Sequence, residues 1–163
     1  MPNVISAADS ATSATSATSA RFAVVVAEWN KSITQKLADG AVKTLTDAGV
    51  ADESIDLVWV PGAWEIPVVT QRLADTCRYW AILALGAVIK GDTSHDHWIN
   101  QGVTDALMRI ATEHSLPVLF GVLTCDTMEQ AIHRSGGDVG NKGAECAEAA
   151  LRMVSLLQAL PTK

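Results

Sequence analysis

The sequence predicts an α/β fold in which helices cover both faces of a mainly parallel sheet. Two observations carry this prediction. The main apolar runs are continuous rather than alternating, which is typical of strands that are covered on both faces. Segments of helical length separate these runs, so strand and helix alternate along the chain.

Apolar runs and helical periodicity place the elements in order. The run Phe-Ala-Val-Val-Val-Ala opens the pattern, and the expected strands are residues 22–27, 55–60, 81–89 and 118–123. In the first helical segment Ile33 and Leu37 begin an apolar stripe, and Pro67 suits the start of the second. Asp126 and Glu129 resemble a capping box at the start of the fourth. The expected helices are residues 33–48, 64–76, 94–114, 126–133 and 143–160.

The chain of 163 residues suits one domain preceded by a tail. Residues 10–20 repeat Ser-Ala-Thr, and such a run has nothing large to bury against its ordering entropy. We therefore expect a flexible Ala/Ser/Thr-rich tail at residues 1–20 and a single domain at residues 21–163. A Ser-rich transit peptide is the alternative, but Arg21 is the only basic residue in the first 21 positions.

Composition limits the partners and the compartment. Hydrophobic residues make up 48% of the chain and charged residues 18%, which suggests that apolar surface is buried against other subunits. The net charge of −6 argues against nucleic acid and anionic membranes as partners. No run is long enough to span a bilayer, no secretory signal is evident, and Cys77, Cys125 and Cys146 are widely spaced. We expect a cytoplasmic protein with reduced thiols.

Ligands of open parallel sheets bind beyond the carboxyl ends of the strands, so the residues there are the first candidates for a site. Trp29 follows the first strand and Trp64 follows the second. Either tryptophan alone is more often a packing or subunit-contact residue. Two at one rim favour a site that stacks a planar heterocycle.

The segment after the third strand combines an anion site with a titratable group. Gly91, Asp92 and Thr93 join a strand to a helix, where free N–H groups and the helix dipole attract anions. Asp92 would have to point its carboxylate away from such an anion. His95 falls in the first helical turn and could act as a general acid or base, although helix-terminal histidines are often only polar surface. His97 lies about 200° further round the helix, which disfavours a shared metal ion.

A glycine-rich segment at residues 132–143 supplies cations. It carries Arg134 and Lys142, which suit phosphate, although a solvated loop is the simpler interpretation of its composition.

These segments resemble the lumazine synthase family from about residue 21 to residue 160. The strongest matches are Val-Pro-Gly-Ala-Trp-Glu-Ile-Pro at 60–67, Leu-Gly-Ala-Val-Ile-Lys-Gly-Asp-Thr-Ser-His at 85–95 and Gly-Asn-Lys-Gly at 140–143. The resemblance implies a flavodoxin-like three-layer α/β/α sandwich with a four-stranded sheet, assembled into pentamers. It also implies a transferase that condenses 5-amino-6-(D-ribitylamino)uracil with 3,4-dihydroxy-2-butanone 4-phosphate, without metal or organic cofactor. The products would be 6,7-dimethyl-8-ribityllumazine, phosphate and water, in the penultimate step of riboflavin biosynthesis.

The resemblance further implies a role for each site residue. Trp29 would stack on the pyrimidine ring, and His95 would be the proton shuttle. Asp92 and Thr93 would form a phosphate cradle that Arg134 joins. The residues that would line the ribityl pocket or contact the ring are Asn30, Ala63, Trp64, Glu65, Ala87, Val88 and Ile89. Those that would come from the neighbouring subunit are Phe120, Arg134 and Lys142.

Departures from the family pattern bear on activity and assembly. Asp96 and His97 stand where the family usually has an aromatic and then an acidic residue, so a tuning role for that acid either is lost or passes to Asp96. Lys90 replaces a frequent arginine. The loop at residues 135–141 is short, which in the family goes with icosahedral shells of twelve pentamers. We expect such a 60-subunit shell, with riboflavin synthase as the protein it could enclose.

Two other functions fit parts of the sequence. A shell protein that holds a flavin or lumazine without turnover would use the same tryptophans, but His95, Arg134 and Lys142 together favour catalysis. A generic nucleotide-binding enzyme would need a GxGxxG or GxxxxGK[ST] motif after the first strand, where Glu28-Trp29-Asn30 stands instead.

Overall fold

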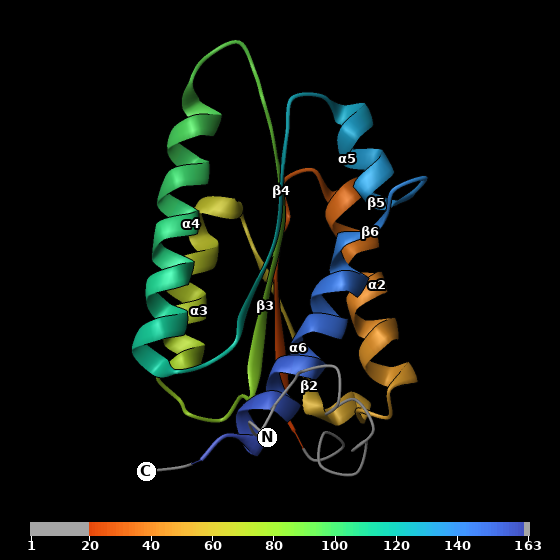
Figure 1. Ribbon diagram of the computed structural model, residues 1–163. Helices are drawn as coiled ribbons and strands as arrows, with labels where there is room; N and C mark the ends of the chain where they lie inside the picture. The colour runs from red at the N-terminus through yellow and green to blue at the C-terminus, as the bar shows by residue number, and fades with distance from the viewer. Residues whose placement is uncertain (1–19, 162–163) are drawn as a thin grey trace, which may run out of the picture.

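Four parallel strands form the centre of the computed structural model, which describes residues 20–161 (Figure 1). They are β1 (Phe22–Ala27), β2 (Ile55–Val60), β3 (Ala81–Ile89) and β4 (Val118–Cys125), in the order β2-β1-β3-β4. Every neighbouring pair is parallel. The predicted α/β fold with a mainly parallel four-stranded sheet is confirmed.

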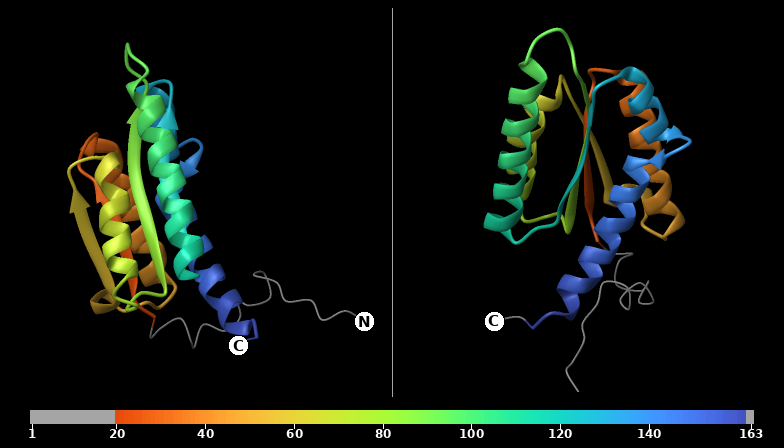
Figure 2. Two further views of the ribbon diagram at one scale, coloured as in Figure 1. Left: turned by 90° about the vertical axis from the view of Figure 1, so that its left-hand side faces the viewer. Right: turned by 45° about the horizontal axis from the view of Figure 1, so that its top comes forward.

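Helices cover both faces of this sheet (Figures 1 and 2). On one face lie α3 (Ile66–Ala74) and α4 (His95–His114), and on the other α2 (Lys31–Asp47), α5 (Met128–Arg134) and α6 (Lys142–Ala159). Short 3-10 turns occupy η2 (Asp52–Ser54) and η3 (Ala63–Glu65), and β5 (Ser135–Gly137) pairs with β6 (Gly140–Asn141) as a small hairpin. Within residues 20–161, no helix combines the length and the apolarity needed to cross a membrane.

The sheet separates two apolar layers, which explains the continuous apolarity of its inner strands. All six residues of β1 are buried, as are the first eight of β3. Phe22, Val24 and Val26 pack toward α2 and α6, whereas the alternate residues Ala23 and Val25 pack toward α3 and α4. Because helices cover both faces, neither side of these strands meets solvent, and nothing selects polar residues at alternate positions.

Several predicted boundaries differ from the structure. The expected helix at residues 64–76 divides into η3 and the shorter α3, and β4 continues two residues beyond the expected strand. The predicted capping box at Asp126 and Glu129 is wrong by one residue. Thr127 is the cap, because its Oγ1 accepts from the Gln130 N–H at 3.3 Å, and the Gln130 side chain in turn accepts from the Asp126 N–H at 2.8 Å. The extended strand delays the start of the helix.

The first described residues are fastened at the amino ends of the strands. Arg21 donates through Nη2 to both carboxylate oxygens of Asp56, at 3.0 and 2.9 Å, and the Tyr79 hydroxyl donates to the same carboxylate at 2.7 Å. The hydrogen bonds from Tyr79 and Arg21 hold the pKa of Asp56 below its ordinary value. Ala20 is buried in the core beside this cluster, and the rest of the predicted flexible tail lies outside the described residues.

The segment Gly-Asn-Lys-Gly at 140–143 joins α6 to α2. The Asn141 side chain caps α6 by accepting from the Gly143 and Ala144 N–H groups at 2.9 and 3.1 Å, and it donates to the Lys36 carbonyl at 2.8 Å. Gly143 lies directly against the Leu37 backbone, so a Cβ there would overlap the Leu37 carbonyl. Part of this family motif therefore has a packing role that the sequence did not reveal.

We predict that Gly143→Ala destabilises the protein by about 3 kcal/mol, because a backbone carbonyl cannot rotate away as a side chain can. Urea denaturation at equal protein concentration measures the effect. Gly91→Ala is the matched control, since no atom lies within 4 Å of the added Cβ, and it should stay within about 1 kcal/mol of wild type. Equal midpoints for G143A and wild type would contradict this account of the helix contact.

Candidate active site

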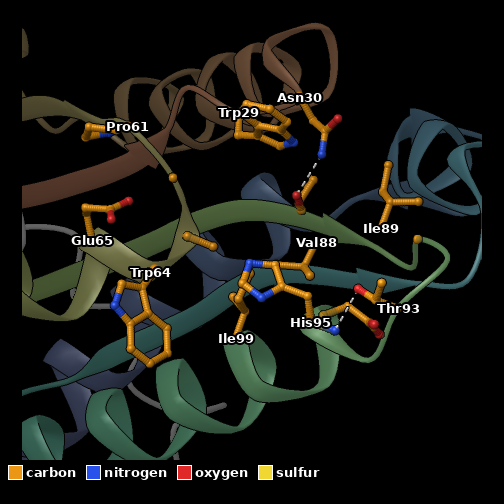
Figure 3. A pocket seen from close by; sticks show the side chains of 15 residues that line it. Trp29, Asn30, Pro61, Trp64, Glu65, Val88, Ile89, Thr93, His95 and Ile99 are labelled. Carbon is orange, nitrogen blue, oxygen red and sulfur yellow. Dashed lines mark hydrogen bonds between the residues drawn. The ribbon is translucent and has the colours of Figure 1, made fainter.

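A cavity of about 500 Å³ opens at the carboxyl ends of the strands (Figure 3). Its walls come from the loops after β1 and β2, from the end of β3, and from the loop and first turns of α4. The predicted site residues that line it are Trp29, Asn30, Ala63, Trp64, Glu65, Ala87, Val88, Ile89, Thr93 and His95. The lining also includes Gly91, expected at the anion site, and Asp96, expected beside His95, together with three residues that were given no role: Pro61, Gly62 and Ile99. Of these, Ile99 could have been found from its i+4 spacing to His95.

The cavity lies where β3 outruns its neighbour. The pairing of β1 with β3 stops at Leu85, whereas β3 continues to Ile89. Beyond Leu85, the edge of β3 on the β1 side therefore presents backbone groups toward the cavity. Asn30 satisfies one of them, because its Nδ2 donates to the Ala87 carbonyl at 2.9 Å.

Hydrogen bonds hold the two tryptophan loops together. The Glu28 N–H donates to the Val60 carbonyl at 2.8 Å and the Trp29 N–H to the Pro61 carbonyl at 3.1 Å, which continues the β1–β2 pairing past the strands. Asn30 then takes a left-handed conformation, with φ 61°, as the N-cap of α2. Asparagine adopts this conformation more readily than most residues.

Both rim tryptophans are unusually accessible. Trp29 is 73% exposed and Trp64 is 59% exposed, although both line the cavity. In Figure 3 the two rings lie apart, Trp29 beside Asn30 and Trp64 beside α4. Two large aromatic side chains left open at one cavity suit a flat ligand or a second subunit that covers them.

The start of α4 supplies the polar side of the cavity. His95 is exposed in the first turn of α4, and its backbone N–H donates to the Thr93 Oγ1 at 3.4 Å. Ser94 is the N-cap but makes no capping hydrogen bond with its side chain. Thr93 lines the cavity, whereas Asp92 does not and is exposed, as an anion site requires of a neighbouring carboxylate.

His95 and His97 belong to different cavities. His97 lines a second, more open cavity between α4 and β4, and its ring meets Trp98 edge to face at 5.2 Å between centroids. Asp96 lines both cavities, so this acidic residue shares the wall with His95. Among residues 20–161 no group of three His, Cys, Asp or Glu side chains could hold a metal ion.

The remaining predicted residues lie away from the main cavity. Phe120 is 40% exposed on β4 and lines the second cavity. Arg134 ends α5, and Lys142 begins α6 with its Nζ 3.1 Å from a Glu145 carboxylate oxygen. As a result the described lining of the main cavity contains carboxylates but no lysine or arginine.

Comparison with known proteins relates the chain to one family. Residues 19–158 match the profile of the family described as 6,7-dimethyl-8-ribityllumazine synthase. A protein of that name from Pediococcus pentosaceus is 46% identical over 140 residues, which cover 86% of this chain and 90% of the relative. The same-named protein from Coxiella burnetii (strain CbuG_Q212) is 45% identical over 138 residues, which cover 85% of this chain and 91% of the relative.

Replacing Asn30 should separate its two contributions. We predict that Asn30→Ala lowers the free energy of unfolding by about 2 kcal/mol, about half from the left-handed backbone and half from the lost hydrogen bond. Asn30→Gly should lose only about 1 kcal/mol, because glycine takes the same backbone conformation without strain. Urea denaturation of both variants tests this, and equal losses in the two would remove the backbone contribution.

Proposed function

The chain belongs to the 6,7-dimethyl-8-ribityllumazine synthase family, and from this premise we propose that the cavity beyond β1, β2 and β3 is its active site. The enzyme is a transferase of riboflavin biosynthesis that condenses 5-amino-6-(D-ribitylamino)uracil with 3,4-dihydroxy-2-butanone 4-phosphate. The observation that carries the site is the meeting of two rim tryptophans with His95 and Thr93 around one cavity. The relatives are named for the enzyme, which favours catalysis over a non-catalytic flavin-binding shell.

On the ring side, the proposal assigns stacking to Trp29 and the ribityl chain to the wall formed by Trp64 and its neighbours. Glu65 can accept hydrogen bonds from sugar hydroxyls, and Asn30 keeps its amide oxygen for the same purpose because its Nδ2 is used on Ala87. Ala63 supplies an apolar floor. The end of β3 at Ala87, Val88 and Ile89 would bind the polar edge of the pyrimidine through backbone groups that β1 does not pair, apart from the Ala87 carbonyl, which accepts from Asn30.

On the phosphate side, the proposal uses the start of α4. Thr93 offers a hydroxyl, and Asp92 would contribute only its N–H group. His95 stands next to this anion position and would move protons during imine formation, phosphate elimination and ring closure. The substrate amine is itself the nucleophile, so positioning and one titratable group could carry the reaction.

The cation for the phosphate would come from a second subunit. The lining described above has no lysine or arginine, and a phosphate in a dry site needs one. Arg134, Lys142 and Phe120 of a neighbouring subunit are the proposed completion, in a pentamer. The short loop at residues 135–141 is the tight β5–β6 hairpin, with Gly136 and Gly140 at positive φ, and its shortness supports a 60-subunit icosahedral shell, which could enclose riboflavin synthase.

The proposal also covers chain organisation and compartment. We propose a single catalytic domain at residues 21–163, preceded by the tail at 1–20. The three cysteines are free thiols, and burial raises the pKa of Cys146 to about 11, which keeps it protonated and unreactive. Free thiols suit a protein that works in the cytoplasm.

The condensation assay tests the assignment of His95. Lumazine fluorescence gives the rate, and the uncatalysed reaction of the two substrates is subtracted. We predict that His95→Ala lowers kcat by about 100-fold without abolishing turnover, because proton transfer is slowed while substrate positioning survives. His114→Ala is the matched control at the far end of α4 and should turn over at the wild-type rate. Wild-type activity of H95A at every pH would remove His95 from the mechanism.

Mixed assemblies test the shared site. Arg134→Ala and His95→Ala should each be nearly inactive alone. When the two variants co-assemble, about a quarter of the sites combine an intact His95 with an intact Arg134 from the neighbour, so activity should return. Thr93→Ala mixed with H95A is the control, because both residues belong to one subunit and no intact site can form. Activity no higher than the mean of the parents in the first mixture would contradict a site built from two subunits.

A further inference from the structure

Gly102 occupies a position in α4 that its helical role does not explain. It lies in the interior of a 20-residue helix, where glycine is less stable than alanine because its backbone loses more conformational freedom on folding. Its φ lies outside the left-handed region, so the backbone conformation does not require glycine. Another constraint must therefore favour a residue without a side chain at this position.

The constraint is the Trp64 ring. A Cβ on Gly102 would lie 2.7 Å from Cζ3, 3.1 Å from Cη2 and 3.8 Å from Cε3 of Trp64, and these are its three nearest atoms. All three belong to the six-membered half of the indole. Figure 3 shows this ring beside α4, on the same side of the cavity as Ile99 and His95. The bare backbone at Gly102 therefore forms a shallow seat for the indole.

We propose that Gly102 is a positioning residue for the substrate cavity. Because it has no side chain, the Trp64 ring can lie close against α4, and this contact fixes the position of the cavity wall that Trp64 forms. Ala63 anchors the η3 turn in the core at 8% exposure, whereas the Trp64 side chain is 59% exposed. The base of the wall is thus held by burial, whereas its exposed ring lies against α4 at Gly102. This proposal rests on the active site proposed above.

A side chain at Gly102 should displace the ring without damaging the fold. Ordinary carbon contacts are about 3.5–4 Å, so the ring must retreat from α4 by about 1 Å. The atoms that must move are the far end of an exposed side chain rather than backbone. Since α4 gains a better helix former at the same time, Gly102→Ala should unfold at a denaturant concentration equal to or above that of wild type.

Four proteins test the proposal as full-length assemblies: wild type, Gly102→Ala, Trp64→Phe and the double variant. G102A should raise the KM for the ribitylaminouracil about three- to tenfold, the effect of disturbing one aromatic contact, and change kcat less than about twofold. In the W64F background the same change should alter KM less than about twofold, because phenylalanine lacks the ring atoms that meet the added Cβ. Thr112→Ala, exposed on the same helix and outside both cavities, controls for helix stabilisation alone and should leave KM unchanged.

A crystal structure of G102A gives a readout that does not depend on substrate, and the Trp64 ring should be shifted there. An equal KM increase from G102A with and without Trp64 would overturn the proposal, as would an unmoved ring. A wild-type KM for Trp64→Ala, which removes the ring altogether, would instead contradict the proposed active site itself, and the shifted ring in G102A would tell the two failures apart.

Discussion

The site depends on a difference in length between two paired strands. β1 stops pairing with β3 at Leu85, and β3 runs on to Ile89, which leaves a step at the carboxyl edge of the sheet. The loops after β1 and β2 close over this step and are bonded to each other there. Asn30 fastens the first loop to the exposed edge of β3. Without the step, the two tryptophans would border a flat sheet end rather than a cavity.

The centre of the fold could be predicted from the sequence, because burial on both faces leaves a strong signal. β1 and β3 match their apolar runs residue for residue. The edges were harder to predict. β4 continues through Thr124, an exposed polar residue that no apolar pattern would include, and the following cap moved from Asp126 to Thr127. Helix and strand ends depend on single hydrogen bonds that periodicity does not register.

The candidate site, like the fold, could be predicted from the sequence only in part. Residues at the strand ends converge because parallel strands share one carboxyl edge, so Trp29, Trp64 and His95 could be brought together by topology alone. Pairwise contacts could not be inferred. From the sequence, Asn141 is only a polar loop residue, but in the structure it caps α6 and connects α6 to α2. Gly102 is only a helix-destabilising residue in the sequence, but in the structure it lies against the indole ring of Trp64. Such contacts join residues distant in sequence, and their chemistry is visible only when both partners are placed.

The cluster of Arg21, Asp56 and Tyr79 fixes the start of the described chain at the amino ends of the strands, and α6 runs back to the same end (Figure 1). Ala20 and Pro161 therefore both leave the subunit on the side remote from the cavity. A dye attached directly beside Ala20 or Pro161 would be tethered behind the edge of the sheet that bears the cavity rather than in front of it. These two ends of the described chain are thus attachment points from which the subunit can be immobilised while the mouth of its cavity stays open.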